Sequence, residues 1–402
     1  MTDATHSAAL ARRAMLFCCL VALCEGLDLQ AAGVAAGGLS REFQPSAAAK
    51  GLFFSASTAG LFVGAVFGGW LADRIGRKQV LVGAIGTFGL FSLLTASATD
   101  MHSLTLMRLL TGLGLGGAMP NLIAFVAETA PTVRRNLSIA TMYMAMPLGG
   151  AVASLIILLA AASQWRLVFL AGGLAPLVIA PLMALFMPGT PVTRRIAAGG
   201  PPPVTVLREL FGHGRALRTL LLWVSFFFAL LVLYLLLSWL PTLLEARGMS
   251  KDQAAAAQVG FNVGGSLCAL LMGALLDSRH RRASIVLAFL TLIAALFVLA
   301  AAPVQAAIVL SLTFLLGGAV LAAQTILYGV AADCYSAANR GVGVGTAVAI
   351  GRLGSIAGPM LGGILVGAGR SPPQVLTGIL PVVIICALGT TLLGWGARAR
   401  DS

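Results

Sequence analysis

The sequence predicts an all-α polytopic membrane protein with twelve transmembrane helices in two six-helix pseudo-repeats. Composition is the first observation behind this prediction. The chain has 402 residues, of which 59% are hydrophobic and 10% are charged, and its mean hydropathy is +0.97. An average soluble domain is about 45–50% apolar and about 25% charged, and disordered chains are poor in hydrophobic residues. Composition therefore excludes both classes.

The second observation is the spacing of the apolar segments. A spanning helix needs about 20 mostly apolar residues, and on that template the chain contains twelve segments. The first six cover 15–38, 48–71, 79–98, 102–127, 138–160 and 166–187. The last six cover 218–241, 252–276, 283–301, 305–330, 341–366 and 374–396. The first segment is too long for a signal peptide and contains Glu25 and Asp28, so we interpret it as a spanning helix.

The longest polar stretch runs from Gly189 to Arg218, between the sixth and seventh segments. It contains five arginines and the run Gly199-Gly200-Pro201-Pro202-Pro203. Clusters of Gly and Pro interrupt helices, so this stretch is interpreted as a linker. The predicted organisation is a six-helix half at 1–188, a cytoplasmic linker at 189–217 and a second six-helix half at 218–402.

The third observation is an internal repeat. A Gly-to-Asp segment followed by a basic pair occurs at 69–78 and again 204 positions later, at 273–282. An acidic residue also precedes a basic one after the fourth and tenth segments, and Pro147-Leu148-Gly149 aligns with Arg352-Leu353-Gly354 at an offset of 205. Two parallel six-helix repeats with the substrate site at their interface are a known transporter plan. A receptor or a membrane enzyme has no particular need for such duplication.

The basic residues orient the chain in the bilayer. Of the 26 Lys and Arg residues, 18 fall at the termini or in the even-to-odd loops. Two, Arg108 and Arg352, lie inside predicted helices. The six in the opposite loops are Arg41, Lys50, Arg166, Arg247, Lys251 and Arg370. The positive-inside rule therefore predicts a plasma (inner) membrane protein with both termini cytoplasmic. The net charge of +13 does not indicate nucleic-acid binding, because the basic residues do not cluster on one folded face.

Several catalytic signatures are absent from the sequence. There is no phosphate-binding loop, no H-E-x-x-H and no G-x-S-x-G. The six cysteines form no C-x-x-C pair and are interpreted as small buried side chains. The four histidines fall in loops or at helix ends: His6, His102, His213 and His280. We therefore expect no enzyme activity, no cofactor, no metal and no direct use of ATP. The expected partners are a small organic anion, protons and the lipid bilayer, and the expected state is a monomer.

The segment Gly69-x-x-x-Asp73-x-x-Gly76-Arg77-Lys78 resembles the signature of the major facilitator superfamily between its second and third helices. Glycine permits a tight turn and close helix packing, and the charged residues can form pairs that exist in one gate position only. The resemblance implies a cytoplasmic gate, although topology determination by Arg and Lys is an alternative role. The implied gate residues are Gly69, Asp73, Gly76, Arg77, Lys78, Glu128, Arg135, Asp277, Arg281, Asp333 and Arg340.

A finer resemblance covers nearly the whole chain and is to the aromatic acid:proton symporter family. It is carried by Glu25-Gly26-Leu27-Asp28, by the glycine-rich run from Arg108 to Gly117, by Tyr234-x-x-x-Ser238-Trp239-Leu240-Pro241, and by Gly351-Arg352-x-Gly354-Ser355-x-x-Gly358-Pro359. The run from Glu25 to Gly33 is most similar to the 3-(3-hydroxyphenyl)propionate transporter branch. Benzoate-type members usually have Asp at the first acidic position, where this chain has Glu25.

Four charged residues inside helices are the candidate machinery. Glu25 and Asp28 share one helix face, and charges at mid-bilayer are costly enough to require a cavity and a partner. Two neighbouring carboxylates repel, which suits one of them to bind and release a proton. The alternative is a fixed ion pair with Arg108 or Arg352. The resemblance implies a proton-pathway role for Arg108 and a carboxylate-clamping role for Arg352, whose planar fork suits that ligand.

An aromatic acid also needs flat walls and partners for ring substituents. The candidates for the walls are Tyr143, Tyr234 and Tyr328, and those for a ring hydroxyl are Asn121 and Gln324. Trp165 and Trp239 lie near helix ends, so we interpret them as members of the interfacial aromatic belt.

The sequence therefore predicts a secondary active transporter that imports an aromatic carboxylic acid, of the hydroxyphenylpropionate type, together with protons. A proton-driven exporter of drugs or organic acids is the nearest alternative, because one fold serves both directions. A non-transporting receptor that senses a ligand is a further alternative, and it would need a soluble output domain that the chain does not contain.

Overall fold

A computed structural model describes residues 2–129, 135–160, 164–187, 210–212, 215–276, 278–335 and 340–396, and all regular structure within these ranges is helical. The chain forms two compact units. The N-terminal unit comprises Met1–Pro45 and Leu52–Ile196, and the C-terminal unit comprises Ser46–Gly51 and Ala197–Ser402. Each unit is described separately below.

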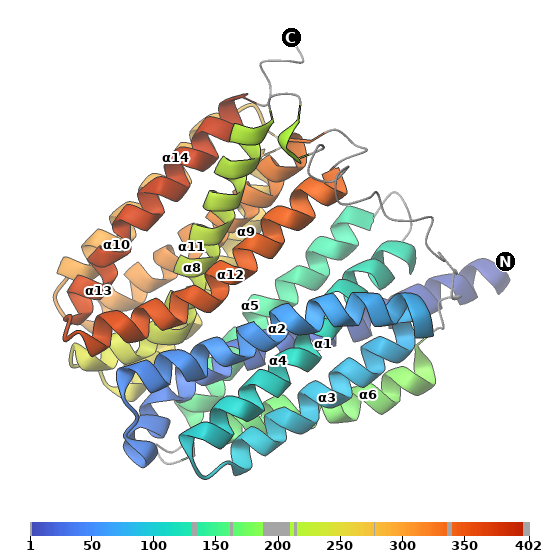
Figure 1. Cartoon of the computed structure of the whole chain (residues 1–402), viewed down its shortest axis with the longest axis horizontal. Helices are drawn as coiled ribbons and strands as arrows, with labels where there is room; N and C mark the ends of the chain where they lie inside the picture. Colours follow the sequence, from blue (N-terminus) through green and yellow to red (C-terminus); the bar gives the residue numbers. More distant parts are fainter. Residues whose placement is uncertain are drawn as a thin grey trace. The chain divides into compact units, whose positions relative to one another are not determined.

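The helices follow the twelve predicted segments (Figure 1). The first six are α1 (Thr2–Phe43), α2 (Ala47–Ile75), α3 (Arg77–Ser97), α4 (Met101–Thr129), α5 (Arg135–Leu159) and α6 (Leu167–Phe186). The remaining ones are α8 (Ala216–Ala246), α9 (Lys251–Leu276), α10 (Arg281–Ala301), α11 (Ala306–Asp333), α12 (Arg340–Gly367), α13 (Pro372–Gly378) and α14 (Leu380–Gly396). The main difference from the prediction is α1, which extends beyond both ends of the segment 15–38.

The twelfth segment is a helix interrupted at Ile379, between α13 and α14. Pro381 lies in the first turn of α14, where its missing N–H is tolerated, whereas inside a continuous helix it would remove a hydrogen bond. At the other end Ser371 and Gln374 form a capping box that begins α13. The two short helices together make one apolar span over Pro372–Trp395.

Length and composition qualify ten of the described helical segments to cross a membrane. The helices α4 and α5 have 29 and 25 residues, and part of α5, Met144–Leu159, is a further apolar stretch. At a rise of about 1.5 Å per residue, both are long enough for a hydrocarbon core about 30 Å thick. The predicted fold class, an all-helical integral membrane protein, is confirmed.

Close glycine contacts repeat between the two units. A Cβ on Gly149 of α5 would lie 1.9 Å from the carbonyl oxygen of Leu23 on α1, and a Cβ on Gly354 of α12 would lie 2.0 Å from that of Phe227 on α8. These partners are separated by 204 and 205 positions, the offsets of the sequence repeat. Since only glycine permits this approach, the same backbone contact holds α1 against α5 and α8 against α12.

A second glycine contact repeats in the same way. A Cβ on Gly60 of α2 would lie 2.0 Å from the carbonyl oxygen of Leu109 on α4, and one on Gly264 of α9 would lie 2.1 Å from that of Phe314 on α11. The internal repeat is thus present in the packing of the helices as well as in the charged loops.

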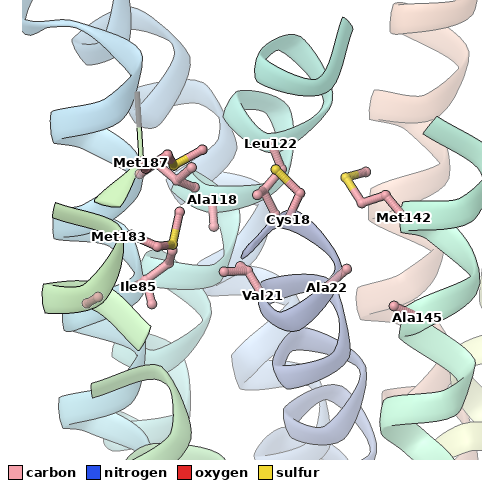
Figure 2. Packing of buried hydrophobic residues seen from close by; sticks show 12 residues of the cluster. Cys18, Val21, Ala22, Ile85, Ala118, Leu122, Met142, Ala145, Met183 and Met187 are labelled. Atoms are coloured by element: carbon pink, nitrogen blue, oxygen red, sulfur yellow. The ribbon is translucent and has the colours of Figure 1, made fainter. Parts of the chain in front are cut away.

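A buried apolar cluster holds α1 inside the N-terminal unit (Figure 2). Cys18, Val21 and Ala22 of α1 contact side chains from α3, α4, α5 and α6. The partners include Ile85, Ala118, Leu122, Met142, Ala145, Met183 and Met187. Flexible Met side chains fill irregular gaps of this kind. The cluster fixes the stretch of α1 that immediately precedes the acidic residues.

The interpretation of Trp165 and Trp239 as lipid-facing belt residues is wrong. Their exposed fractions are 2% and 0%. The indole of Trp165 packs on Gly38 and donates to Oε2 of Glu42 at 2.9 Å. The indole of Trp239 donates to the carbonyl oxygen of Pro359 at 2.9 Å. Both rings lie over glycines within their own unit, because the missing side chain leaves room for them there.

Candidate functional site

The N-terminal unit contains a buried ion pair between Asp28 of α1 and Arg108 of α4. Nη1 of Arg108 lies 2.7 Å from both carboxylate oxygens, and its Nη2 donates to the backbone carbonyl of Asp28 at 3.0 Å. The exposed fractions of the two side chains are 0% and 1%. Such a pair repays its desolvation cost only with good geometry and further hydrogen bonds. Nη1 and Nη2 of Arg108 both make such bonds here, whereas its buried Nε has no acceptor among the described residues.

Two other helices complete the surroundings of this pair. Ser92 of α3 donates to Oδ1 of Asp28 at 3.2 Å and also lies 3.2 Å from the carbonyl oxygen of Phe169 on α6. The ring of Phe169 lies 5.6 Å from the Arg108 guanidinium carbon, within the range of a cation–π contact. The ion pair therefore joins α1, α3, α4 and α6.

Glycines next to the charged residues set the positions of their helices. Gly26 lies between the two acids, and a Cβ there would be 1.8 Å from the carbonyl oxygen of Met146 on α5. Gly112, one turn after Arg108, makes the corresponding approach to Ser57 of α2 at 1.9 Å. Gly26 and Gly112 thus set the distances between α1 and α5 and between α4 and α2, and these distances position the charged side chains.

Glu25 lies one turn before Asp28 on α1 and its exposed fraction is 0%. The sequence left two roles open for the acids, a fixed ion pair and a proton-binding group. The contacts to Arg108 give the ion-pair geometry to Asp28.

The C-terminal unit contains a second cluster, built around Arg352 of α12. Its Nη1 donates to the hydroxyl of Tyr234 on α8 at 3.2 Å. The Tyr328 ring on α11 packs edge-on against Phe226 of α8 at 5.3 Å between centroids, and a Cβ on Gly351, the neighbour of Arg352, would lie 3.3 Å from the Cβ of Phe226. The structure thus brings three of the predicted substrate residues together. Phe226 was missed because nothing in the apolar run around it distinguishes it.

The glycines of α12 explain the position of Arg352. Gly351, Gly354 and Gly358 all face α8, and Cβ atoms on the last two would lie 2.0 and 2.3 Å from the carbonyl oxygens of Phe227 and Leu231. A Cβ on Gly351 would also lie 2.4 Å from Leu230 of α8. Tyr234 follows one turn after Leu230, so this close contact brings Arg352 within reach of the Tyr234 hydroxyl.

The two candidate amides differ in their contacts. Nδ2 of Asn121 donates to the carbonyl oxygens of Gly117 at 2.8 Å and Gly68 at 3.4 Å. Gln324 on α11 is 7% exposed, and its Nε2 has no hydrogen-bond acceptor among the described residues. Asn121 therefore joins α4 to α2, whereas Gln324 retains an unused donor.

Some of the predicted gate residues make contacts at the loops between helices. Arg281, which begins α10, forms an ion pair with Asp333, which ends α11. Lys78 donates to the carbonyl oxygen of Met187 at 2.6 Å, just beyond the end of α6. Gly76 has φ 101°, a conformation that favours glycine in the turn between α2 and α3.

The other gate residues are less informative. Arg77 is half-buried at the start of α3, and Gly69 has open space where a Cβ would stand. The side chains of Asp73, Glu128, Arg135, Asp277 and Arg340 lie outside the described residues, and so does that of Tyr143, a candidate wall of the substrate site.

Two compact helical units that repeat the same glycine contacts, with charged side chains inside apolar helices, have the architecture of a membrane transporter. The comparisons with known proteins agree. The model of the Major Facilitator Superfamily matches residues 18–359 and, in a second match, 222–400. The chain belongs to this superfamily, and it is a transporter and not an enzyme.

Similar proteins cover nearly the whole chain. The 3-(3-hydroxyphenyl)propionate transporter of Escherichia coli K12 is 40% identical over 94% of this chain and 92% of its own length. The 4-hydroxybenzoate transporter and the gallate transporter of Pseudomonas putida are 34% and 33% identical, each over 96% of this chain and over 93% and 92% of their own lengths.

Solved structures show the same fold. A bacterial homologue of the human lysosomal transporter Spinster, in an inward-facing conformation, matches with a TM-score of 0.76 and 18% identity, over 96% of this chain and 97% of its own. A D-xylose–proton symporter matches with a TM-score of 0.75 and 16% identity, over 96% of both chains.

Proposed function

We propose that this transporter takes up an aromatic carboxylic acid of the hydroxyphenylpropionate type, together with protons. The observation that carries the proposal is the cluster of Arg352, Tyr234 and Tyr328. It combines a mid-helix guanidinium with a hydroxyl and an aromatic ring inside one unit. The three relatives named above are all transporters of hydroxylated aromatic acids, which supports the same class of substrate.

Arg352 binds the substrate carboxylate in this proposal. A guanidinium offers two parallel N–H donors that match a carboxylate, and it stays charged at any physiological pH. Tyr234 holds that guanidinium through its hydroxyl oxygen. Tyr328 is 41% exposed, so part of its ring is available to contact the aromatic ring of a ligand.

The N-terminal unit supplies proton coupling. Arg108 balances the charge of Asp28, and we assign proton binding and release to Glu25, one turn away on the same helix. A substrate anion at Arg352 and a proton at Glu25 together lower the cost of holding the charged residues away from water. Movement of one half against the other then becomes favourable only when both are bound.

The topology belongs to the same proposal. The distribution of Lys and Arg supports a plasma (inner) membrane location with both termini cytoplasmic. The halves 1–188 and 218–402 are joined by a cytoplasmic linker at 189–217, and the protein acts as a monomer. The Arg281–Asp333 pair supports a charged cytoplasmic gate, because it joins the loop ends of α10 and α11.

The test is uptake of labelled 3-(3-hydroxyphenyl)propionate into proteoliposomes, with and without an inward proton gradient. We expect accumulation above equilibrium only with the gradient, and its loss when a protonophore is added. Uptake that does not depend on the gradient would contradict proton coupling. Absence of specific uptake for every aromatic acid tested would contradict the proposed substrate class.

Export is the second candidate, because one fold serves both directions, and Pro147-x-Gly149-Gly150 only partly resembles a motif of many exporters. In the structure Gly149 serves the contact with Leu23 of α1, which any close helix pair needs. Vesicles that trap labelled acid inside, with the proton gradient directed either way, distinguish the two directions of net flux.

A further inference from the structure

Two buried amides were candidates for a ring substituent, and the structure separates them. The N–H groups of Asn121 are used on the backbone carbonyls of Gly117 and Gly68. The contact with Gly68 joins α4 to α2, so this side chain has a packing role.

The amide of Gln324 is different. Its Nε2 is buried and has no hydrogen-bond acceptor among the described residues, while the side chain as a whole is 7% exposed. An unmade hydrogen bond of this kind is unfavourable, and native structures keep few of them without a functional reason. A bound ligand with an acceptor atom would satisfy the group.

The surroundings of Gln324 indicate what that ligand is. Tyr328 lies one turn further along α11, about 6 Å along the helix axis, and its ring is partly exposed beside Phe226. Phe226 also lies beside the Arg352 segment of α12, because a Cβ on Gly351 would be 3.3 Å from the Cβ of Phe226. An aromatic acid that contacts Tyr328 through its ring and Arg352 through its carboxylate would therefore lie next to α11, the helix that carries Gln324.

We propose that Gln324 donates a hydrogen bond to an oxygen substituent on the aromatic ring, and so selects oxygen-bearing acids over unsubstituted ones. This inference rests on the proposed function. It also places both recognition contacts, carboxylate and ring oxygen, in the C-terminal unit, whereas the Asp28–Arg108 pair lies in the N-terminal unit. A site built to hydrogen-bond a substituent rejects the analogue that lacks it, because the buried donor stays unpaired.

The test compares three ligands on the purified full-length protein: 3-(3-hydroxyphenyl)propionate, its 3-methoxy analogue and 3-phenylpropionate. Since an amide N–H donates to either oxygen, the hydroxy and methoxy acids should both bind about tenfold more tightly than 3-phenylpropionate. Gln324→Met keeps the length of the side chain and removes the donor, so in this variant the ratio of either affinity to that of 3-phenylpropionate should fall to about one. The affinity for 3-phenylpropionate should not change.

The matched control is Gln253→Met, at an exposed glutamine near the start of α9, which should keep wild-type ratios. Equal wild-type affinities for all three acids would overturn the inference and leave the proposed function intact. A preference for the hydroxyl alone, with methoxy as weak as the bare ring, would show an acceptor rather than a donor and also overturn it. Loss of all three ligands in Gln324→Met would assign the residue a structural role, and failure of the wild type to bind any of them would remove both proposals.

Discussion

Arg108 holds both carboxylate oxygens of Asp28 at 2.7 Å through a single nitrogen, with both side chains fully buried. A second ion pair in the same unit, between Arg166 and Glu42, has two 2.6 Å contacts but is about one-third exposed. Breaking the buried pair should cost more folding free energy than breaking the exposed one. Removing one partner of a buried pair leaves an uncompensated charge in a medium that cannot solvate it.

The first prediction concerns this difference. Asp28→Asn or Arg108→Gln should each destabilise the protein by about 3–5 kcal/mol, and the double variant should recover part of that loss. The control Glu42→Gln should cost no more than about 1 kcal/mol. Thermal unfolding in detergent measures all four, and a double variant that loses the sum of the two single effects would contradict the pairing.

The second prediction separates the two acids of α1. Glu25→Gln should keep exchange of labelled for unlabelled substrate across the membrane but lose accumulation driven by a proton gradient. The reason is that it removes the proposed proton site while leaving the Asp28–Arg108 pair in place. Gradient-driven accumulation by Glu25→Gln would show that another group carries the proton.

The third prediction concerns the carboxylate clamp. Arg352→Lys keeps the charge but removes the planar fork, and it should weaken binding of the aromatic acid by about tenfold or more. The primary amide of the same acid, which has no carboxylate, should bind wild type and variant equally weakly. Unchanged affinity for the acid in both Arg352→Lys and Arg352→Ala would exclude Arg352 from the binding site.

The fourth prediction tests the repeated glycine contacts. Gly149→Ala and Gly354→Ala each place a methyl group about 2 Å from a backbone oxygen, and each should destabilise by about 1–3 kcal/mol or more and lower transport. Gly86→Ala in α3 is the control, because open space surrounds that position. It should be neutral or stabilise by up to about 1 kcal/mol, since Ala favours a helix. Equal effects at all three positions would contradict the packing argument.

The fifth prediction is a pH dependence at Cys334, just beyond the end of α11. Burial raises the pKa of this thiol from the ordinary 9.0 to about 11, with the charge of nearby Arg218 opposing. At pH 8 about one molecule in a thousand therefore carries the reactive thiolate, against about one in ten for an ordinary thiol. Maleimide labelling followed by mass spectrometry should show slow modification of Cys334, rising about tenfold per pH unit up to about pH 10. Rapid labelling at pH 7 would contradict the burial.

Much of the architecture was predictable because a bilayer leaves few alternatives. Backbone groups in lipid must be paired internally, so each apolar segment of about 20 residues had to be a helix. The duplication was also visible, since charged loop residues and helix glycines recur at constant spacing. The break at Ile379 and the full length of α1 were not predicted. The break lies next to Pro381, and the C-terminal end of α1 contacts Trp165 through Gly38 and Glu42.

Residue type alone selected the four charged side chains and most of the aromatic candidates, because such residues are costly inside a membrane and easy to notice. Their partners were beyond the sequence. Tertiary structure decided that Arg108 pairs with Asp28 and that Trp165 and Trp239 are buried. It also decided that Asn121 joins two helices, while Gln324 keeps a donor that none of the described residues uses. Each of these depends on which helix faces meet, and close glycine contacts between helices set that arrangement at distances no linear pattern contains.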